Sequence, residues 1–145
     1  MPDRLRARAL RLLARREHTR AELAAKLKPH AEDERQLAAL LDELEARGWL
    51  SETRFVESVL HARRARYGSA RIAHELRSKG VSEDAIERAA RGLRATELQA
   101  AREVWRRKFG RRPASPAERA RQARFLASRG FATEVIRRVL DGRED

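Results

Sequence analysis

Apolar residues recur along this chain at the spacing of helices and not at the alternation of strands. Leu, Ile, Val and Ala return every three or four positions, which places them on one face of a helix. Nine such stripes follow one another, beginning with those at residues 5–13, 23–27 and 37–44. Good helix formers dominate the composition and β-branched residues are few. The pattern therefore predicts an all-α chain of nine short helices without a sheet.

Glycines and capping residues divide the stripes. A glycine after a helical stripe can take the left-handed conformation that ends a helix, and five fit this description: Gly48, Gly80, Gly110, Gly130 and Gly142. Gly68 and Gly92 also fall at expected helix ends. Helix starts are indicated by N-cap residues with an acid or proline behind them, at Thr19, Ser82, Ser115 and, less clearly, Thr133.

One short phrase occurs three times, about fifty residues apart, at 22–27, 75–80 and 125–130. Each copy has Leu at its second position and a cation at its fifth. A period of this size indicates a repeat protein in which one small unit is stacked several times. We therefore predict three tandem three-helix repeats, residues 1–50, 51–93 and 94–145, with the phrase on each middle helix. The joints at 48–51 and 92–96 are short, so the units are expected to pack as an elongated, curved helical array.

Charge points to a polyanionic partner. The formal net charge is +12, and residues 102–129 hold ten Lys or Arg against two Glu. Such an excess attracts phosphates or acidic protein surfaces, although cations at a helix end also suit the helix dipole. The candidate binding residues in this basic third are Arg106, Arg107, Lys108, Arg121, Arg124 and Arg129.

Signals for catalysis are missing. There is no phosphate-binding Gly loop, nucleophile elbow or metalloprotease motif. The chain has no Cys, and its four His stand apart, so we expect histidines that lie at the surface or support a neighbouring residue, and neither a metal site nor a cofactor. No apolar stretch is long enough to cross a membrane, and no signal peptide is evident, which favours a cytoplasmic protein that is not an enzyme.

Five aromatic residues are candidates for stacking on nucleic-acid bases. Their positions on apolar stripes or after a C-terminal glycine favour core packing instead, and this applies to Trp49, Trp105, Phe109, Phe125 and Phe131. Residues 18–27 are similar to the first helix of a helix-turn-helix. The segment that follows is strongly acidic, however, with six Asp or Glu between residues 32 and 45. Phosphates would repel such a reading helix, so sequence-specific operator binding is disfavoured.

Two longer motifs carry a family resemblance. The first runs through Tyr67-Gly68, Arg71-Ile72, Glu75-Leu76 and Lys79-Gly80-Val81. The second runs through Trp105, Lys108-Phe109, Gln122, Phe125-Leu126 and Arg129-Gly130-Phe131. In this order and separation they resemble the central and C-terminal motifs of the RecX family. The first unit matches less well, since Leu27 stands where the other copies of the phrase have Gly.

The resemblance implies a function that composition does not show. It implies an all-helical negative modulator that binds the RecA filament on single-stranded DNA and depresses its ATPase, strand-exchange and coprotease activities. The other hypothesis is a basic helical DNA-binding module, a regulator or architectural protein, that acts independently of RecA. We expect a monomer that contacts the filament through the basic third. The second choice of contact is the central motif, through Arg64, Arg71 and Lys79.

Overall fold

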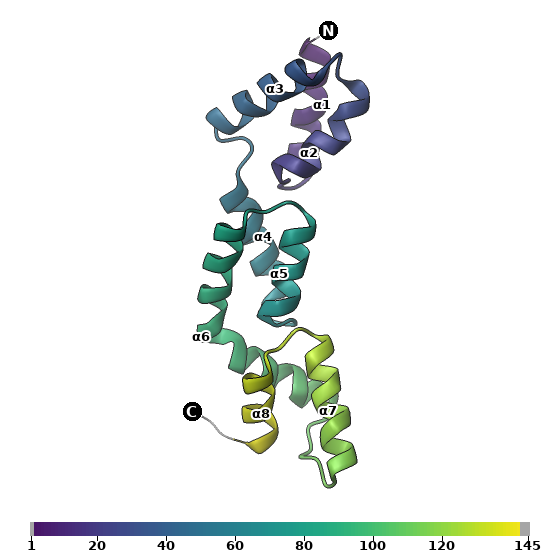
Figure 1. The fold of residues 1–145 in the computed structure, drawn as a ribbon, viewed down its shortest axis with the longest axis vertical. Helices are drawn as coiled ribbons and strands as arrows, with labels where there is room; N and C mark the ends of the chain where they lie inside the picture. Colours follow the sequence, from purple (N-terminus) through teal and green to yellow (C-terminus); the bar gives the residue numbers. More distant parts are fainter. Residues whose placement is uncertain (1, 143–145) are drawn as a thin grey trace.

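The computed structural model describes residues 2–142, and within that range it contains α-helices, one 3₁₀ turn and no strand. The chain forms an elongated stack whose first and last helices lie at opposite ends (Figure 1). The elements are α1 (Pro2–Arg15), α2 (Arg20–Leu27), η1 (Lys28–His30), α3 (Glu34–Ala46), α4 (Glu52–Arg63), α5 (Ser69–Ser78), α6 (Glu83–Lys108), α7 (Pro116–Ser128) and α8 (Thr133–Asp141).

The helices form three units of three, each around a small core of its own. The first unit is α1, α2 and α3; the second is α4, α5 and the start of α6; the third is the end of α6, α7 and α8 (Figure 1). Three separate clusters of buried side chains correspond to these units. Leu23, Leu76 and Leu126, the second residues of the repeated phrase, are each fully buried in one of them. The predicted tandem three-helix repeat is therefore confirmed.

The expected nine helices are eight α-helices in residues 2–142, because α6 is continuous where a break was predicted. Gly92 lies inside this 26-residue helix and does not end one. A glycine in a helix interior costs about 1 kcal/mol relative to Ala. Here the cost is offset by an unbroken buried stripe at every fourth position, Ala89, Leu93, Glu97 and Ala101, which ties the second unit to the third.

The two joints between units share one geometry. At the first joint the C-terminal end of α5 meets the N-terminal end of α2, and the Thr19 hydroxyl donates to the Lys79 carbonyl at 2.5 Å. At the second joint the end of α7 meets the start of α5, and the Gly68 amide donates to the Arg129 carbonyl at 2.8 Å. The cation of the repeated phrase thus supplies its backbone carbonyl to the preceding unit in both cases.

This geometry explains the glycine that ends the phrase. Gly80 and Gly130 have φ of +86° and +87°, and an added Cβ would come within 2.7 Å of Ala21 Cβ or 2.5 Å of the Arg71 nitrogen. Only a residue without a side chain permits both the left-handed backbone and the close approach. Leu27, which replaces the glycine in the first copy, is instead buried in the core of the first unit.

Two local expectations were wrong. Trp49 is 40% exposed, since it follows the left-handed Gly48 and lies outside the first core. His18 is buried next to the first joint, where its Nδ1 lies 3.0 Å from the Arg16 carbonyl, so of the two places expected for a histidine it takes the supporting one. Thr133 is the first residue of α8 and not its cap, which is Ala132. The caps at Thr19, Ser82 and Ser115 are confirmed.

Candidate functional site

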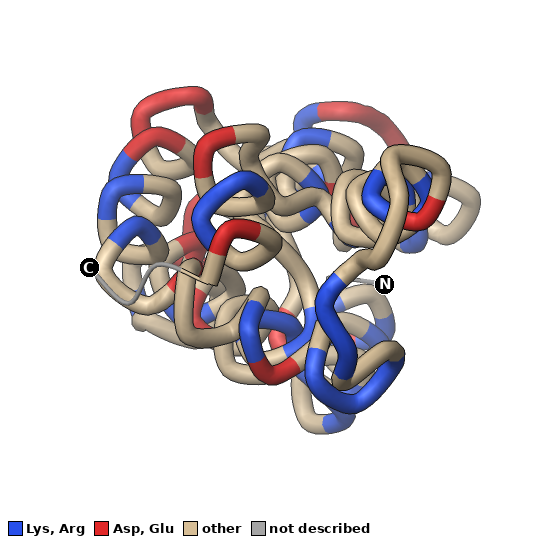
Figure 2. Tube along the Cα trace, turned by 90° about the horizontal axis from the view of Figure 1, so that it is seen from below, with Lys and Arg blue, Asp and Glu red and all other residues tan. Residues whose placement is uncertain are grey.

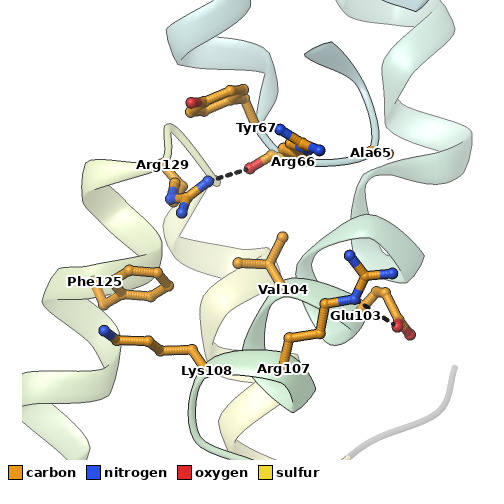
Figure 3. A pocket seen from close by; sticks show the side chains of 9 residues that line it. All are labelled: Ala65, Arg66, Tyr67, Glu103, Val104, Arg107, Lys108, Phe125 and Arg129. Carbon is orange, nitrogen blue, oxygen red and sulfur yellow. Dashed lines mark hydrogen bonds and ion pairs between the residues drawn. The ribbon is translucent and has the colours of Figure 1, made fainter. Parts of the chain in front are cut away.

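A hollow of about 390 Å³ opens where the second unit meets the third. Three segments form it: the turn between α4 and α5, the last turns of α6, and the face of α7 that looks toward α6 (Figure 3). Its lining combines cations with aromatic and aliphatic surface, and consists of Ala65, Arg66, Tyr67, Glu103, Val104, Arg107, Lys108, Phe125 and Arg129.

The cations of the hollow lie against its rings. The Lys108 ammonium is 5.3 Å from the centre of the Phe125 ring, and the Arg129 guanidinium is 5.2 Å from the same ring. Arg129 is also 5.2 Å from the Tyr67 ring. Figure 3 shows Lys108 and Arg129 on either side of Phe125, with Val104 of α6 beside them. Cation–π contacts of this kind hold long basic side chains in place while leaving them charged.

The acid in the hollow is already neutralised. Glu103 accepts from Arg107 at 3.3 Å and from Arg106 at 2.7 Å, one turn further along α6. The Arg66 side chain has no hydrogen bond or ion pair within residues 2–142, although its carbonyl accepts from Arg129 at 3.5 Å. Four cations around one paired carboxylate leave the hollow with a clear positive excess, which suits an anionic ligand.

The structure brings together three of the six residues proposed in the basic third. Arg107, Lys108 and Arg129 meet at the hollow. Arg106 instead lines a different depression, together with Trp105 and Arg112. Arg121 and Arg124 lie on the exposed side of α7, without an ion pair within residues 2–142, one turn or less from Phe125.

The second-choice residues from the central motif have structural partners. Arg64 ends α4 and donates to the Thr96 hydroxyl of α6 at 3.2 Å. Arg71 lies 4.4 Å from the Tyr67 ring and donates to the Ser128 carbonyl at 3.2 Å, so it holds the second joint. Lys79 belongs to the first joint, 3.7 Å from the Glu22 carboxylate and away from the hollow.

Sequence reasoning missed several residues that build the site. Gln122 is buried, accepts from the Trp105 indole at 2.8 Å and donates to the Arg111 carbonyl at 3.1 Å, which fixes the loop between α6 and α7. Arg112, part of the basic excess that the sequence shows in residues 102–129, donates to the Leu140 carbonyl at 3.0 Å and so caps α8. Gln122 is a polar residue on an apolar helical stripe, and this position could have indicated from the sequence that it is buried and hydrogen-bonded.

Arg66 and Tyr67 were also absent from the predicted site. The sequence feature that could have indicated them is their position in the loop between two helical stripes. In the structure this loop forms a turn that projects from the second unit against the end of α6. The expectation that Phe125 belongs to a core holds only in part, because its ring makes an edge contact with Phe109 at 5.5 Å while its remaining surface lines the hollow. Trp105 and Phe109 likewise are only partly buried.

The wider surface is also rich in cations. Figure 2 looks along the molecule from the end of the third unit and shows Lys and Arg on several sides, with Asp and Glu between them. Within residues 2–142 no cluster of three His, Asp or Glu side chains is placed to hold a metal ion. No helix of the described chain has the length and apolar character of a membrane span. What distinguishes the hollow is therefore the meeting of cations with aromatic surface.

Comparison with known proteins assigns all three units. Residues 6–44, 51–89 and 95–140 match the family models for the first, second and third three-helix domains of RecX. Regulatory protein RecX of Leptothrix cholodnii is 57% identical over 94% of this chain and 87% of its own. The RecX of Pseudomonas entomophila is 43% identical over 99% and 94%.

Solved structures show the same fold. The crystal structure of RecX from Lactobacillus salivarius superimposes with a TM-score of 0.84 over 97% of this chain and 95% of that one, at 16% sequence identity. The stacked three-helix units are thus retained where few residues are shared. Matches in sequence over every unit, and in fold over nearly the whole length, lead to one conclusion: the chain belongs to the RecX family of regulatory proteins.

Proposed function

We propose that this protein is a negative modulator of the RecA recombinase. In this proposal it binds the RecA filament on single-stranded DNA and depresses its ATPase, strand-exchange and coprotease activities. The observation that carries the proposal is membership of the RecX family in all three units. The elongated stack and the net charge of +12 support it, because an extended basic surface suits a long anionic partner.

The proposed contact surface is the basic hollow and the exposed side of α7 beside it. Arg107, Lys108 and Arg129 surround the hollow, and Arg121 and Arg124 continue the positive surface along α7. The planar guanidinium binds phosphate and carboxylate in the same two-pronged manner, so this surface fits a nucleoprotein filament that presents both groups. The protein is proposed to act as a cytoplasmic monomer.

The decisive experiment is ATP hydrolysis by the cognate RecA on single-stranded DNA, measured while this protein is titrated. A filament modulator slows hydrolysis at amounts far below those that saturate the DNA. A DNA-binding module that acts independently of RecA slows it only when it covers the strand. Inhibition that appears solely near DNA saturation would therefore favour the second function.

A charge-reversal series tests the surface. Replacing Arg106, Arg107 and Arg124 by Glu is expected to abolish inhibition of RecA, because three cations in and around the hollow become carboxylates. The matched control replaces Arg11, Arg88 and Arg94 by Glu, since these three are exposed and without ion pairs within residues 2–142. The control changes the net charge equally, so a difference between the two variants locates the contact. Circular dichroism checks that both stay helical, as surface variants usually do.

A further inference from the structure

We propose that the hollow between the second and third units holds one nucleotide of single-stranded DNA, with its base on the Phe125 ring and its phosphate among the surrounding cations. The inference rests on the proposed function, since it names what the basic surface touches in the filament. It also stands on geometry of its own, because the hollow combines a flat apolar surface with a ring of positive charge.

The apolar part of the hollow suits a base. Val104 and Phe125 lie on neighbouring helices, and Phe125 is fixed from behind by its edge contact with Phe109 at 5.5 Å between ring centres. A ring held in this way offers a stacking surface that does not need to be ordered on binding. Stacking of bases on aromatic side chains tolerates any sequence, as a protein acting along a filament requires.

The cations of the hollow suit the phosphate. Lys108 rests on the Phe125 ring through a cation–π contact at 5.3 Å, so an incoming base can take its place. Arg129 lies 5.2 Å from the same ring and is also held by the Arg66 carbonyl and the Tyr67 ring, so it stays at the rim. The displaced cation then has a phosphate within reach, as does Arg66, whose side chain has no ion pair within residues 2–142. Arg107 is held by Glu103 at the opposite rim.

The surface beyond the hollow offers a path for the rest of the strand. Arg121 lies four residues before Phe125 on α7 and so shares the face that carries the ring, whereas Arg124, one residue before Phe125, lies about 100° around the helix from it. Both are exposed and without an ion pair within residues 2–142. A strand with one base in the hollow would meet these two arginines with its neighbouring phosphates, which is the pattern of single-strand-binding grooves.

An acidic protein segment fits the same charges less well. A carboxylate would satisfy the cations but would leave Val104 and the face of Phe125 in contact with water. The cations also stand on opposite rims of the hollow, with the apolar surface between them (Figure 3). A nucleotide supplies both a flat apolar base for this central surface and a phosphate for the cations at the rim.

The test measures binding of the full chain to a fluorescein-labelled oligo(dT) by fluorescence anisotropy, without RecA, and to a strand of equal length made of abasic sites. Phe125→Leu removes the ring and keeps apolar packing, whereas Phe125→Tyr keeps the ring. Lys108→Gln removes a hollow cation, and Arg88→Gln removes an exposed cation elsewhere on α6 as the control. Thermal melts followed by circular dichroism verify folding, and Lys108 is exposed, so Lys108→Gln leaves the core of the third unit unchanged.

Wild type is expected to bind oligo(dT) at least about fivefold more tightly than the abasic strand. Phe125→Leu should lose this preference while Phe125→Tyr retains it. Lys108→Gln should weaken binding to both strands and reduce the salt dependence of the binding constant by about 0.7 in logarithmic slope, the value for one phosphate on a single strand. Arg88→Gln should leave both the preference for oligo(dT) and this slope at their wild-type values.

Two results would overturn the inference. One is a wild type that binds both strands equally, because no base is then stacked. The other is oligo(dT) binding that is unchanged in Phe125→Leu and Lys108→Gln while both variants lose inhibition of RecA. That result assigns the hollow to an acidic segment of a protein and leaves the proposed function intact. If the wild type does not inhibit RecA but still prefers oligo(dT) to the abasic strand, the proposed function is rejected and the nucleotide site stands.

Discussion

The first and second joints use the equivalent backbone carbonyl of the repeated phrase but pair it with different donors. At the first joint the carbonyl of Lys79 accepts from a side-chain hydroxyl, that of Thr19. At the second, the equivalent carbonyl of Arg129 accepts from a backbone amide, that of Gly68. A side chain thus does at one joint what the main chain does at the other.

The N-terminal caps of α2 and α5, the helices that meet these carbonyls, also differ between the two joints. The start of α2 is capped by its own residue, because the Glu22 carboxylate accepts from the Thr19 amide at 3.1 Å. The start of α5 has a glycine at its N-cap and is capped from another element, since Glu97 of α6 accepts from the Ser69 amide at 3.0 Å. The second joint is therefore also tied to α6, the helix that runs through both units.

The charged groups sharpen the contrast. At the first joint burial opposes the charge of Glu22, but hydrogen bonds from Arg16 and the Thr19 amide and the nearby Arg16 and Lys79 charges outweigh it, so its pKa falls to about 2. Burial lowers the pKa of His18 beside it. The first joint thus depends on ionised side chains around Glu22, whereas the second adds backbone hydrogen bonds and a continuous helix to the contacts of Arg71 and Glu97. We expect the first to weaken in acid and the second to be the stiffer of the two.

The largest effect is expected from the glycine of the second joint. In Gly130→Ala the new Cβ would lie 2.4 Å from Arg71 Cβ and 2.5 Å from the Arg71 nitrogen, at φ +87°. Left-handed strain and overlap together should lower the free energy of unfolding by about 3 kcal/mol or more. Urea unfolding followed by circular dichroism measures it.

Gly48→Ala is the matched control, because Gly48 has φ +75° and nothing within 4 Å of the added carbon. It carries the backbone strain alone and should cost only about 1–2 kcal/mol. Equal losses in the two variants would mean that the units are not in contact at Gly130. The expectation that the second joint is the stiffer of the two would then be contradicted.

Acid is expected to act on the first joint. The pKa of Glu22 is about 2 in the folded chain against an ordinary 4.5, and its side chain is only 9% exposed. The stabilisation that the Glu22 carboxylate gives the folded chain is therefore complete above the pKa of the unfolded state. It is lost as the pH falls through the pKa of the folded state. The linkage amounts to up to about 3 kcal/mol over this window.

Glu22→Gln isolates this contribution, because every other carboxylate titrates in both proteins. The unfolding free energies of wild type and variant, measured in urea from about pH 6 down to about pH 2, should converge as the pH falls. A difference that stays constant across the window would show that the charge of Glu22 contributes nothing to the first joint.

Glu97 makes the corresponding test at the second joint. Glu97→Ala removes the carboxylate that accepts from the Ser69 amide and hydroxyl, at 3.0 and 3.2 Å. Loss of a cap that also leaves a buried donor unpaired should cost about 2 kcal/mol. Glu97→Gln keeps an acceptor oxygen and should lose less in the same urea unfolding assay. Equal losses would mean that the hydrogen bonds are not what Glu97 supplies.

The joints also show which parts of the fold the sequence predicts. Thr19 and Glu22 stand three residues apart, so their capping box was visible as a local pattern. Glu97 caps α5 from 28 residues away, and nothing local marks it. Gly92 was misjudged for the same reason, since the buried stripe that carries α6 past it belongs to two units at once. Local signals predict single helices, whereas contacts between units decide where two stripes become one helix.

The candidate site was predicted less completely than the fold. Charge density identified the region of Arg107 and Lys108, because an excess of cations is a property of sequence alone. Which cations meet depends on helix phase at the end of α6: Arg106 and Arg107 both bind Glu103, yet they line different depressions. Arg66 joins them from the neighbouring unit, and only the packing of the second joint brings it there.

The smallest expected effect concerns the hydroxyl that distinguishes the first joint. Thr19 accepts from the Glu22 amide at 3.0 Å as the N-cap of α2 and donates to the Lys79 carbonyl at 2.5 Å. Thr19→Ala removes both hydrogen bonds and should lower the free energy of unfolding by about 1 kcal/mol. Thr19→Ser keeps the hydroxyl and should retain most of that stability in urea unfolding. If Ser and Ala lose the same amount, the methyl group and not the hydroxyl holds the first joint, and the contrast between side-chain and main-chain joints fails.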